Sequence, residues 1–162
     1  MKENKDLKKR KSIRLKEYDY SQEGMYFITI CTKNRIKLLG KIDNVGANCV
    51  RPKIELSYIG NMIKREIDKI KLIYQNVNID EYIIMPNHIH MIIQIDDGRT
   101  QFAPTISRII KQYKGNITKQ IGYSIWQKSF YEHIIRNEKE LYKIKEYIQY
   151  NPLNWEKDKY NC

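Results

Sequence analysis

Two of the three histidines in the 162-residue chain stand two positions apart, at His88 and His90. They begin the run from His88 to Ile95, in which every second residue is apolar, and this alternation predicts a β-strand. Positions i and i+2 of a strand face the same side of a sheet, so both imidazoles are expected to project together. Two adjacent nitrogen donors, with no cysteine nearby, suit a divalent metal ion that keeps open coordination positions. The alternative is a pair of half-buried histidines that only fills one face of the strand.

A tyrosine and an asparagine near the C-terminus form the second candidate group. Asn137 is typical of a helix N-cap, and Pro152 must end the helix that starts at Glu138. Tyr147 lies on the border of the apolar stripe of this helix, and Asn151 follows one turn later on the same side. Together they can present a hydroxyl group and a carbonyl ligand to a neighbouring cleft. A tyrosine that only packs at the helix edge, and an asparagine that only ends the helix, would give the same pattern.

The rest of the sequence predicts the strands and helices that must position these four side chains. Segments rich in β-branched and aromatic residues predict strands at 25–32, 77–85, 88–95 and 125–135. Amphipathic patterns predict helices at 56–74 and 104–121, before the helix that starts at Glu138. Residues 33–55 have no clear period, which is typical of a loop or a short extra hairpin. The order predicts an α+β fold, a ferredoxin-like βαββαβ antiparallel sheet with helices on one face plus a C-terminal helix.

Charge and composition indicate which class of molecule the protein binds. Thirty Lys and Arg against nineteen Asp and Glu give a formal net charge of +11, which favours a polyanion such as nucleic acid. No apolar stretch is long enough to span a membrane, and residues 1–16 lack the apolar core of a secretory signal, so we expect a cytoplasmic protein with no membrane partner. We expect residues 1–20 to form a flexible basic arm, 21–155 a single domain and 156–162 a short tail.

Three segments of the chain together resemble one protein family. Residues 85–90, MPNHIH, are similar to the HUH signature (His, hydrophobic, His) of the single-tyrosine transposases of insertion-sequence type. Residues 126–137, WQKSFYEHIIRN, and 146–152, EYIQYNP, resemble the REP-associated tyrosine transposase branch in particular. The resemblance runs from about Tyr20 to Trp155. Three such segments in this order and at this spacing are specific for the family.

The resemblance implies a metal-dependent endonuclease and strand transferase that acts on single-stranded DNA beside a REP-like hairpin. His88 and His90 would match the metal ligands of the family, and Asn151 would take the place of its third ligand, which is often Gln. Tyr147 would be the nucleophile that forms a 5′-phosphotyrosine, and Mg²⁺ or Mn²⁺ would be the cofactor. Tyr150 is a rival nucleophile, but the pattern E-Y-I-x-x-N-P favours Tyr147. The branch also favours a monomer over a dimer.

Basic and aromatic residues supply candidate DNA contacts. We expect DNA to meet the basic face of the second predicted helix, made of Arg108, Lys111, Lys114 and Lys119. Trp126 is a candidate for stacking with an unpaired base, although a place in the core is the alternative. His133 is expected to be a structural histidine.

Three other functions fit parts of the same pattern. An HxH phosphoesterase would use the two histidines as acid and base without a covalent tyrosine link, but such enzymes usually bring a second His motif, and only His133 is available. A non-catalytic module for single-stranded nucleic acid would need exposed aromatic residues on the sheet, where this chain carries His and Ile. A family member that cuts its hairpin without mobilising DNA would have the same sequence features.

Overall fold

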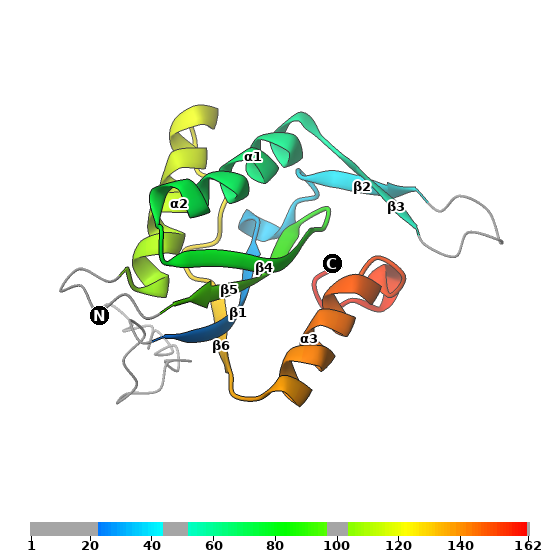
Figure 1. Cartoon of the computed structure of the whole chain (residues 1–162). Helices are drawn as coiled ribbons and strands as arrows, with labels where there is room; N and C mark the ends of the chain where they lie inside the picture. Colours follow the sequence, from blue (N-terminus) through cyan, green and yellow to red (C-terminus); the bar gives the residue numbers. More distant parts are fainter. Residues whose placement is uncertain (1–22, 44–51, 97–103, 162) are drawn as a thin grey trace, which may run out of the picture.

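A four-stranded antiparallel sheet forms the centre of the computed structural model, which describes residues 23–43, 52–96 and 104–161 (Figure 1). Its strands are β1 (Gly24–Cys31), β4 (Val77–Ile84), β5 (His88–Ile95) and β6 (Tyr131–Ile135). They lie in the order β4-β5-β1-β6, so the first and third strands of the βαββαβ unit pair at the centre of the sheet. This is the ferredoxin-like arrangement, and the predicted fold class is confirmed. The basic arm expected at residues 1–20 lies outside the described residues.

Helices cover both faces of this sheet (Figure 1). α1 (Tyr58–Ile73) and α2 (Ile106–Ile121) lie on one face, and α3 (Glu138–Tyr150) lies on the other. The pleat of β5 explains the division, because alternate residues point to opposite faces. Ile89 and the odd-numbered residues that follow it join the core beneath α1 and α2, whereas Ile92 packs with Ile148 of α3. His88 and His90 share the α3 side with Ile92.

Local signals in the sequence set the helix ends. Ser57 accepts a hydrogen bond from the backbone N–H of Gly60, so α1 begins just after the predicted start. Asn137 Oδ1 accepts a hydrogen bond from Glu140 N at 2.9 Å, and α3 starts where the sequence predicted.

Among the described residues, no helix combines the length and the apolar character needed to cross a bilayer.

The structure adds detail to the prediction in two segments. The loop or hairpin expected at 33–55 contains the short helix η1 (Lys33–Arg35) and a separate antiparallel pair of strands, β2 (Gly40–Asp43) and β3 (Lys53–Leu56). The fourth strand, predicted at 125–135, pairs continuously only from Tyr131. Trp126 makes an isolated bridge with Thr32, because the chain must first return from the end of α2 to the sheet edge.

Candidate active site

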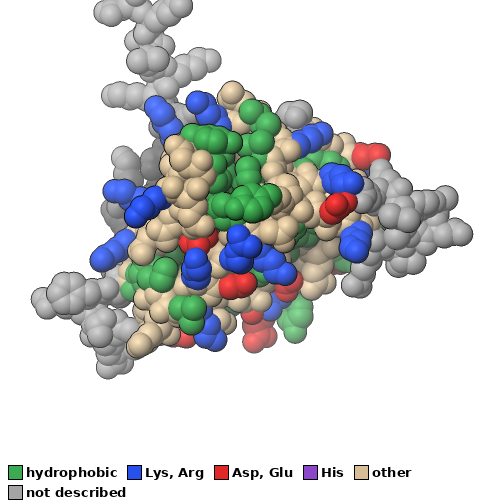
Figure 2. Space-filling model, turned by 90° about the horizontal axis from the view of Figure 1, so that it is seen from above, with side chains coloured by type: hydrophobic (Ala, Val, Ile, Leu, Met, Phe, Trp, Pro, Cys, Tyr) green, Lys and Arg blue, Asp and Glu red, His purple; other side chains and the backbone are tan. Residues whose placement is uncertain are grey.

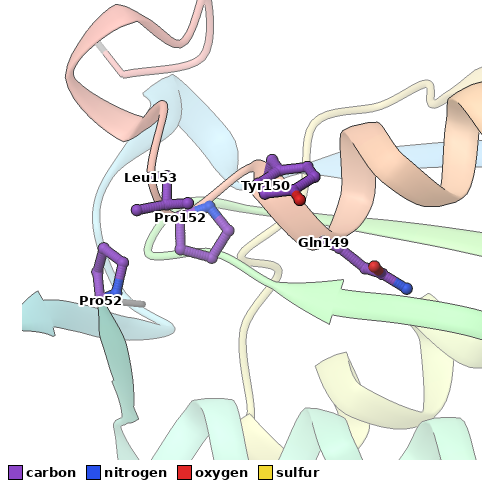
Figure 3. A pocket seen from close by; sticks show the side chains of 5 residues that line it. All are labelled: Pro52, Gln149, Tyr150, Pro152 and Leu153. Atoms are coloured by element: carbon purple, nitrogen blue, oxygen red, sulfur yellow. The ribbon is translucent and has the colours of Figure 1, made fainter. Parts of the chain in front are cut away.

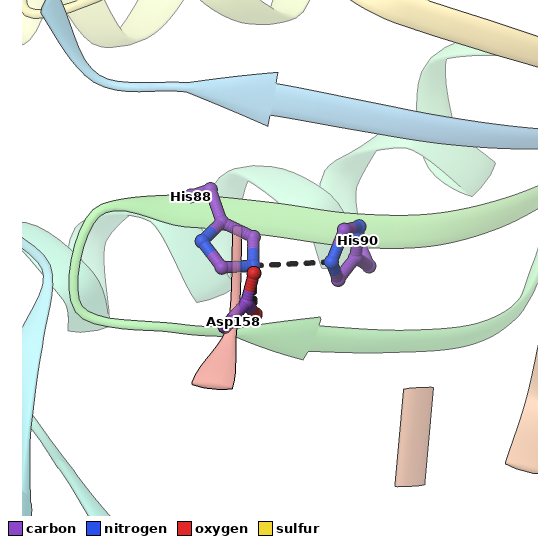
Figure 4. Close-up of side chains that lie close together, drawn as sticks. All are labelled: His88, His90 and Asp158. Atoms are coloured by element: carbon purple, nitrogen blue, oxygen red, sulfur yellow. Dashed lines mark hydrogen bonds and ion pairs between the residues drawn. The ribbon is translucent and has the colours of Figure 1, made fainter. Parts of the chain in front are cut away.

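The two histidines at the start of β5 converge on one point. His88 Nε2 and His90 Nε2 are 3.0 Å apart, and both side chains are almost fully buried (Figure 4). Two donors that bind one ion at about 2.1 Å, at angles near 90–110°, are themselves separated by roughly 3 Å. The prediction that the pair projects together is confirmed, and the spacing of the two nitrogens suits a shared ion.

The outer nitrogen of each imidazole has its own partner. Asn87 Nδ2 donates to the backbone oxygens of Arg35 and Tyr160, so Asn87 Oδ1 is the acceptor for His88 Nδ1 at 2.9 Å. His90 Nδ1 lies 2.8 Å from Thr29 Oγ1, on the neighbouring residue of β1. When Nδ1 carries the proton, the lone pair of Nε2 is free to bind a metal. These partners fix the orientation of both rings.

A carboxylate that was not predicted from the sequence completes the cluster. Asp158 Oδ2 lies 3.8 Å from His88 Nε2, and the Asp158 side chain is 2% exposed (Figure 4). The ligand atoms of His88, His90 and Asp158 all lie within 4.8 Å of one another. Asp158 belongs to the segment expected to be a short tail, where it is one of two acidic residues in the run WEKDKY, and no sequence pattern distinguishes it from Glu156.

Helix α3 brings the predicted tyrosine and asparagine to the same point. Tyr147 Oη lies 3.3 Å from His90 Nε2, and the Tyr147 side chain is 40% exposed. Asn151 is buried at the end of α3, where its Nδ2 donates to Asp158 Oδ2 at 3.0 Å. Asn151 Oδ1 is also buried, and no hydrogen-bond partner for it is found among the described residues. The structure therefore brings together all four residues that the sequence singled out for catalysis and metal binding.

Burial governs the protonation of the cluster. It lowers the pKa of His88 to about 4, although the nearby Asp158 carboxylate acts in the opposite direction. Burial, with the neighbouring His88, also holds the pKa of His90 well below its usual range. Both imidazoles are thus neutral at pH 7, as metal binding requires. Burial, followed by the charge of Asp158, raises the pKa of Tyr147 to about 12, so this phenol needs a nearby positive charge to ionise.

Aromatic rings from the C-terminal segment cover His88. The ring of Tyr160 lies 4.7 Å from the His88 ring, and Trp155, in the short helix η2 (Trp155–Lys157), stacks on it at 6.0 Å. Cations lie over these two rings, with Arg35 5.3 Å from the Tyr160 centroid and Lys37 5.4 Å from that of Trp155. The segment after α3 is therefore part of the wall of the site.

The rival nucleophile points elsewhere. Tyr150 lines a pocket of about 230 Å³ together with Pro52, Gln149, Pro152 and Leu153 (Figure 3). This pocket lies between the end of α3 and the start of β3, whereas Tyr147 faces the His pair. The geometry therefore favours Tyr147 over Tyr150.

The predicted DNA-binding residues lie on the other side of the sheet from the His pair. Figure 2 looks down on the face covered by α1 and α2, where Lys and Arg side chains are spread over the surface and no histidine is visible. Arg108, Lys111 and Lys119 are exposed on α2, and their contact with DNA stays a prediction. Lys114 is partly buried and donates to the backbone oxygen of Gln127 at 2.6 Å.

Two further residues considered in the sequence, Trp126 and His133, contact other side chains of the fold. Trp126 is 4% exposed and packs against Tyr113 in the core, so, contrary to the expectation, it offers no face on which a base could stack. His133 Nε2 lies 2.6 Å from Glu140 Oε1 of α3, which agrees with the structural role expected for it.

Comparison with known proteins identifies related sequences and related solved structures. No protein-family model matches the chain. A Haemophilus influenzae protein of uncharacterised function is 39% identical over 177 aligned positions, which cover 96% of this chain and 94% of that protein. The REP-associated tyrosine transposase of Escherichia coli is 28% identical over 135 positions, which cover 83% of this chain and 69% of the transposase. Among solved structures, that of a REP-associated tyrosine transposase bound to a REP hairpin matches with a TM-score of 0.64 and 26% identity, over 87% of this chain and 74% of that one.

Proposed function

The chain belongs to the family of the REP-associated tyrosine transposases, and we propose that it is a metal-dependent endonuclease and strand transferase of single-stranded DNA. A DNA-processing function of the transposase type follows from the membership. The proposed endonuclease and strand-transfer activity is supported above all by one observation: Tyr147 Oη lies 3.3 Å from Nε2 of His90. A hydroxyl nucleophile beside a pair of neutral imidazoles is an arrangement suited to attack on a phosphodiester.

The residues present fit a divalent metal such as Mg²⁺ or Mn²⁺. His88 Nε2, His90 Nε2 and the unpartnered Asn151 Oδ1 would hold the ion. When bound, such an ion neutralises part of the charge on a phosphate and makes its phosphorus more electrophilic. The lone acceptor at Asn151 supports this assignment, because a buried oxygen without a donor costs free energy unless a cation binds it.

Tyr147 would then be the nucleophile of the reaction. Its Oη forms a bond to the phosphorus, the bond to the 3′ oxygen breaks, and the products are a 5′-phosphotyrosine and a free 3′-hydroxyl. The phenol proton leaves to solvent, which reaches the half-exposed ring, and the departing oxygen takes up a proton in turn. Attack of a 3′-hydroxyl on the phosphotyrosine reverses the step, so strands are rejoined without ATP.

The proposed substrate is single-stranded DNA next to a REP-like hairpin. The support is the solved relative, which is bound to a REP hairpin, and the net charge of +11. A phosphoesterase with a second histidine motif is disfavoured, because His133 pairs with Glu140 instead of joining the His pair.

A cleavage assay on labelled hairpin oligonucleotides with Mg²⁺ or Mn²⁺ tests the proposal. We expect a protein–DNA adduct that survives a denaturing gel, requires the metal, and is lost in Tyr147→Phe. Tyr150→Phe is the matched control, since it removes a hydroxyl one turn away on the same helix, and it should keep the adduct. An adduct that persists in Tyr147→Phe, or cleavage without any adduct, would refute the assignment of the nucleophile.

A further inference from the structure

We propose that Asp158 supplies the anionic ligand of the metal site, from a segment beyond the helix that carries Tyr147. The inference rests on the metal site of the proposed function and adds a residue to it. Asp158 Oδ2 lies 3.8 Å from His88 Nε2 (Figure 4). The rings of Trp155 and Tyr160, from the same segment, pack against the His88 ring.

The burial of the carboxylate is the first argument. The Asp158 side chain is 2% exposed, and it accepts hydrogen bonds from Asn151 Nδ2 at 3.0 Å and from the backbone N–H of Tyr160 at 2.8 Å. Both donors are neutral groups, an amide side chain and a backbone N–H. A buried carboxylate is stable when it is paired with a positive charge or binds a metal. The distance of 3.8 Å to His88 Nε2 is too long for a hydrogen bond, but two ligands of one ion can stand that far apart.

The unpartnered oxygen of Asn151 is the second, independent argument. Asn151 is 2% exposed, and its Oδ1 has no hydrogen-bond partner among the residues that the structure describes. Because Nδ2 is held by Asp158, the amide cannot turn to place its donor elsewhere, and Oδ1 is left as an acceptor alone. Asp158 thus acts twice, as a ligand and as the group that orients a second ligand.

The resulting donor set combines two imidazole nitrogens, one carboxylate oxygen and one amide oxygen. Such a mixture suits a divalent first-row ion, and Mn²⁺ is a convenient probe for it. The carboxylate also supplies the negative charge that the two neutral histidines and the amide lack. The inference implies that residues 85–90 and 146–152 hold only part of the site, and that the segment after α3 completes it.

Titration calorimetry of the full-length protein with Mn²⁺ tests the inference without DNA. We expect Asp158→Asn to weaken Mn²⁺ binding by roughly tenfold or more, since an anionic ligand becomes neutral. Asp158→Glu, which keeps the carboxylate, should bind Mn²⁺ more tightly than Asp158→Asn. Glu156→Gln is the matched control, because it makes the same charge change at an exposed position two residues away, and it should bind as the wild type does.

The outcomes separate this inference from the proposed function. Wild-type affinity in Asp158→Asn, or equal affinity in the Asn and Glu variants, would overturn the role of Asp158. If His88→Ala still abolished binding in that case, the metal site of the proposed function would stand. A wild-type protein that bound no Mn²⁺ would overturn both. Thermal unfolding without metal checks that each variant is folded.

Discussion

The hydroxyl oxygen of Tyr147 lies 3.3 Å from Nε2 of His90, although 57 positions separate the two residues in the chain. The packing of α3 on the sheet creates this relationship. Ile148 is buried against Phe27 and Ile92, which fixes the rotation of the helix about its axis. The preceding residue, Tyr147, must then lie at the border of the contact, over the His pair. The position of the proposed nucleophile therefore depends on the apolar face of its helix.

The same surroundings predict how Tyr147 ionises. In the metal-free protein, burial and the charge of Asp158 raise the pKa of Tyr147 to about 12. Asp158→Asn removes a negative charge that opposes formation of the phenolate, so we expect the pKa of Tyr147 to fall toward its ordinary value near 10. Titration of ¹³Cζ-labelled tyrosine by NMR measures the change, and Tyr147→Phe identifies the resonance.

A charge change at the surface should not have this effect. Glu156→Gln alters an exposed carboxylate in the same segment, and the pKa of Tyr147 should stay near 12 in this variant. An unchanged pKa in Asp158→Asn would mean that the carboxylate does not act on the phenol.

Thr29 is expected to tune metal affinity without touching the metal. Its Oγ1 lies 2.8 Å from His90 Nδ1, so Thr29→Val keeps the shape of the side chain and removes the partner of that nitrogen. Loss of such a partner typically weakens metal binding by about tenfold or more, because the ring is no longer held in one tautomer and orientation. Mn²⁺ calorimetry checks this, with Thr29→Ser, which keeps the hydroxyl, as the control. Equal affinity of the Val and Ser variants would argue against the role of this hydrogen bond.

Local sequence patterns predicted the elements that carry the site. β5 begins at His88 and α3 begins after Asn137 as predicted, because strand alternation and a capping side chain are both set by neighbouring residues. The joint projection of the His pair followed from the same alternation. The roles expected for Tyr147 and Asn151 came from the resemblance to the transposase family, because spacing alone left them open.

The parts that the sequence did not predict depend on tertiary contacts. Asp158 reaches the His pair only because the chain turns back after α3, and no periodic pattern marks that turn. Trp126 stands close to the end of α2, and only the fold shows that it is buried against Tyr113. Sequence patterns report which face of an element is apolar, but they do not report which distant segment covers it.

Acid should destabilise the metal-free protein in a window set by His88. Its pKa is about 4 in the folded state and near 6.5 in the unfolded chain, so between these values only the unfolded chain takes up the proton. The free energy of unfolding should therefore fall as the pH drops from about 6.5 to 4, by on the order of 3 kcal/mol from this residue. His90, whose pKa is also lowered, adds to the loss in the same direction.

Urea unfolding between pH 4 and pH 8 measures this loss. Because other groups also titrate at low pH, the comparison is with His88→Asn, whose stability should depend less steeply on pH in that window. If the free energy of unfolding depended equally steeply on pH in the two proteins, His88 would not be neutral and buried in the folded state.

Two glycines in helices should respond to alanine in opposite ways. Gly60 in α1 lies so close to the residue that precedes β2 that a Cβ atom there would stand 2.0 Å from the backbone oxygen of Leu39. Gly60→Ala must push the helix away from the hairpin, and we expect a loss of roughly 2 kcal/mol or more in the free energy of unfolding. Gly115 in α2 has no atom within 4 Å of the same position, so Gly115→Ala should gain up to about 1 kcal/mol from helix propensity alone. Urea unfolding of both variants checks the pair, and a stable Gly60→Ala would show that the hairpin moves aside without cost.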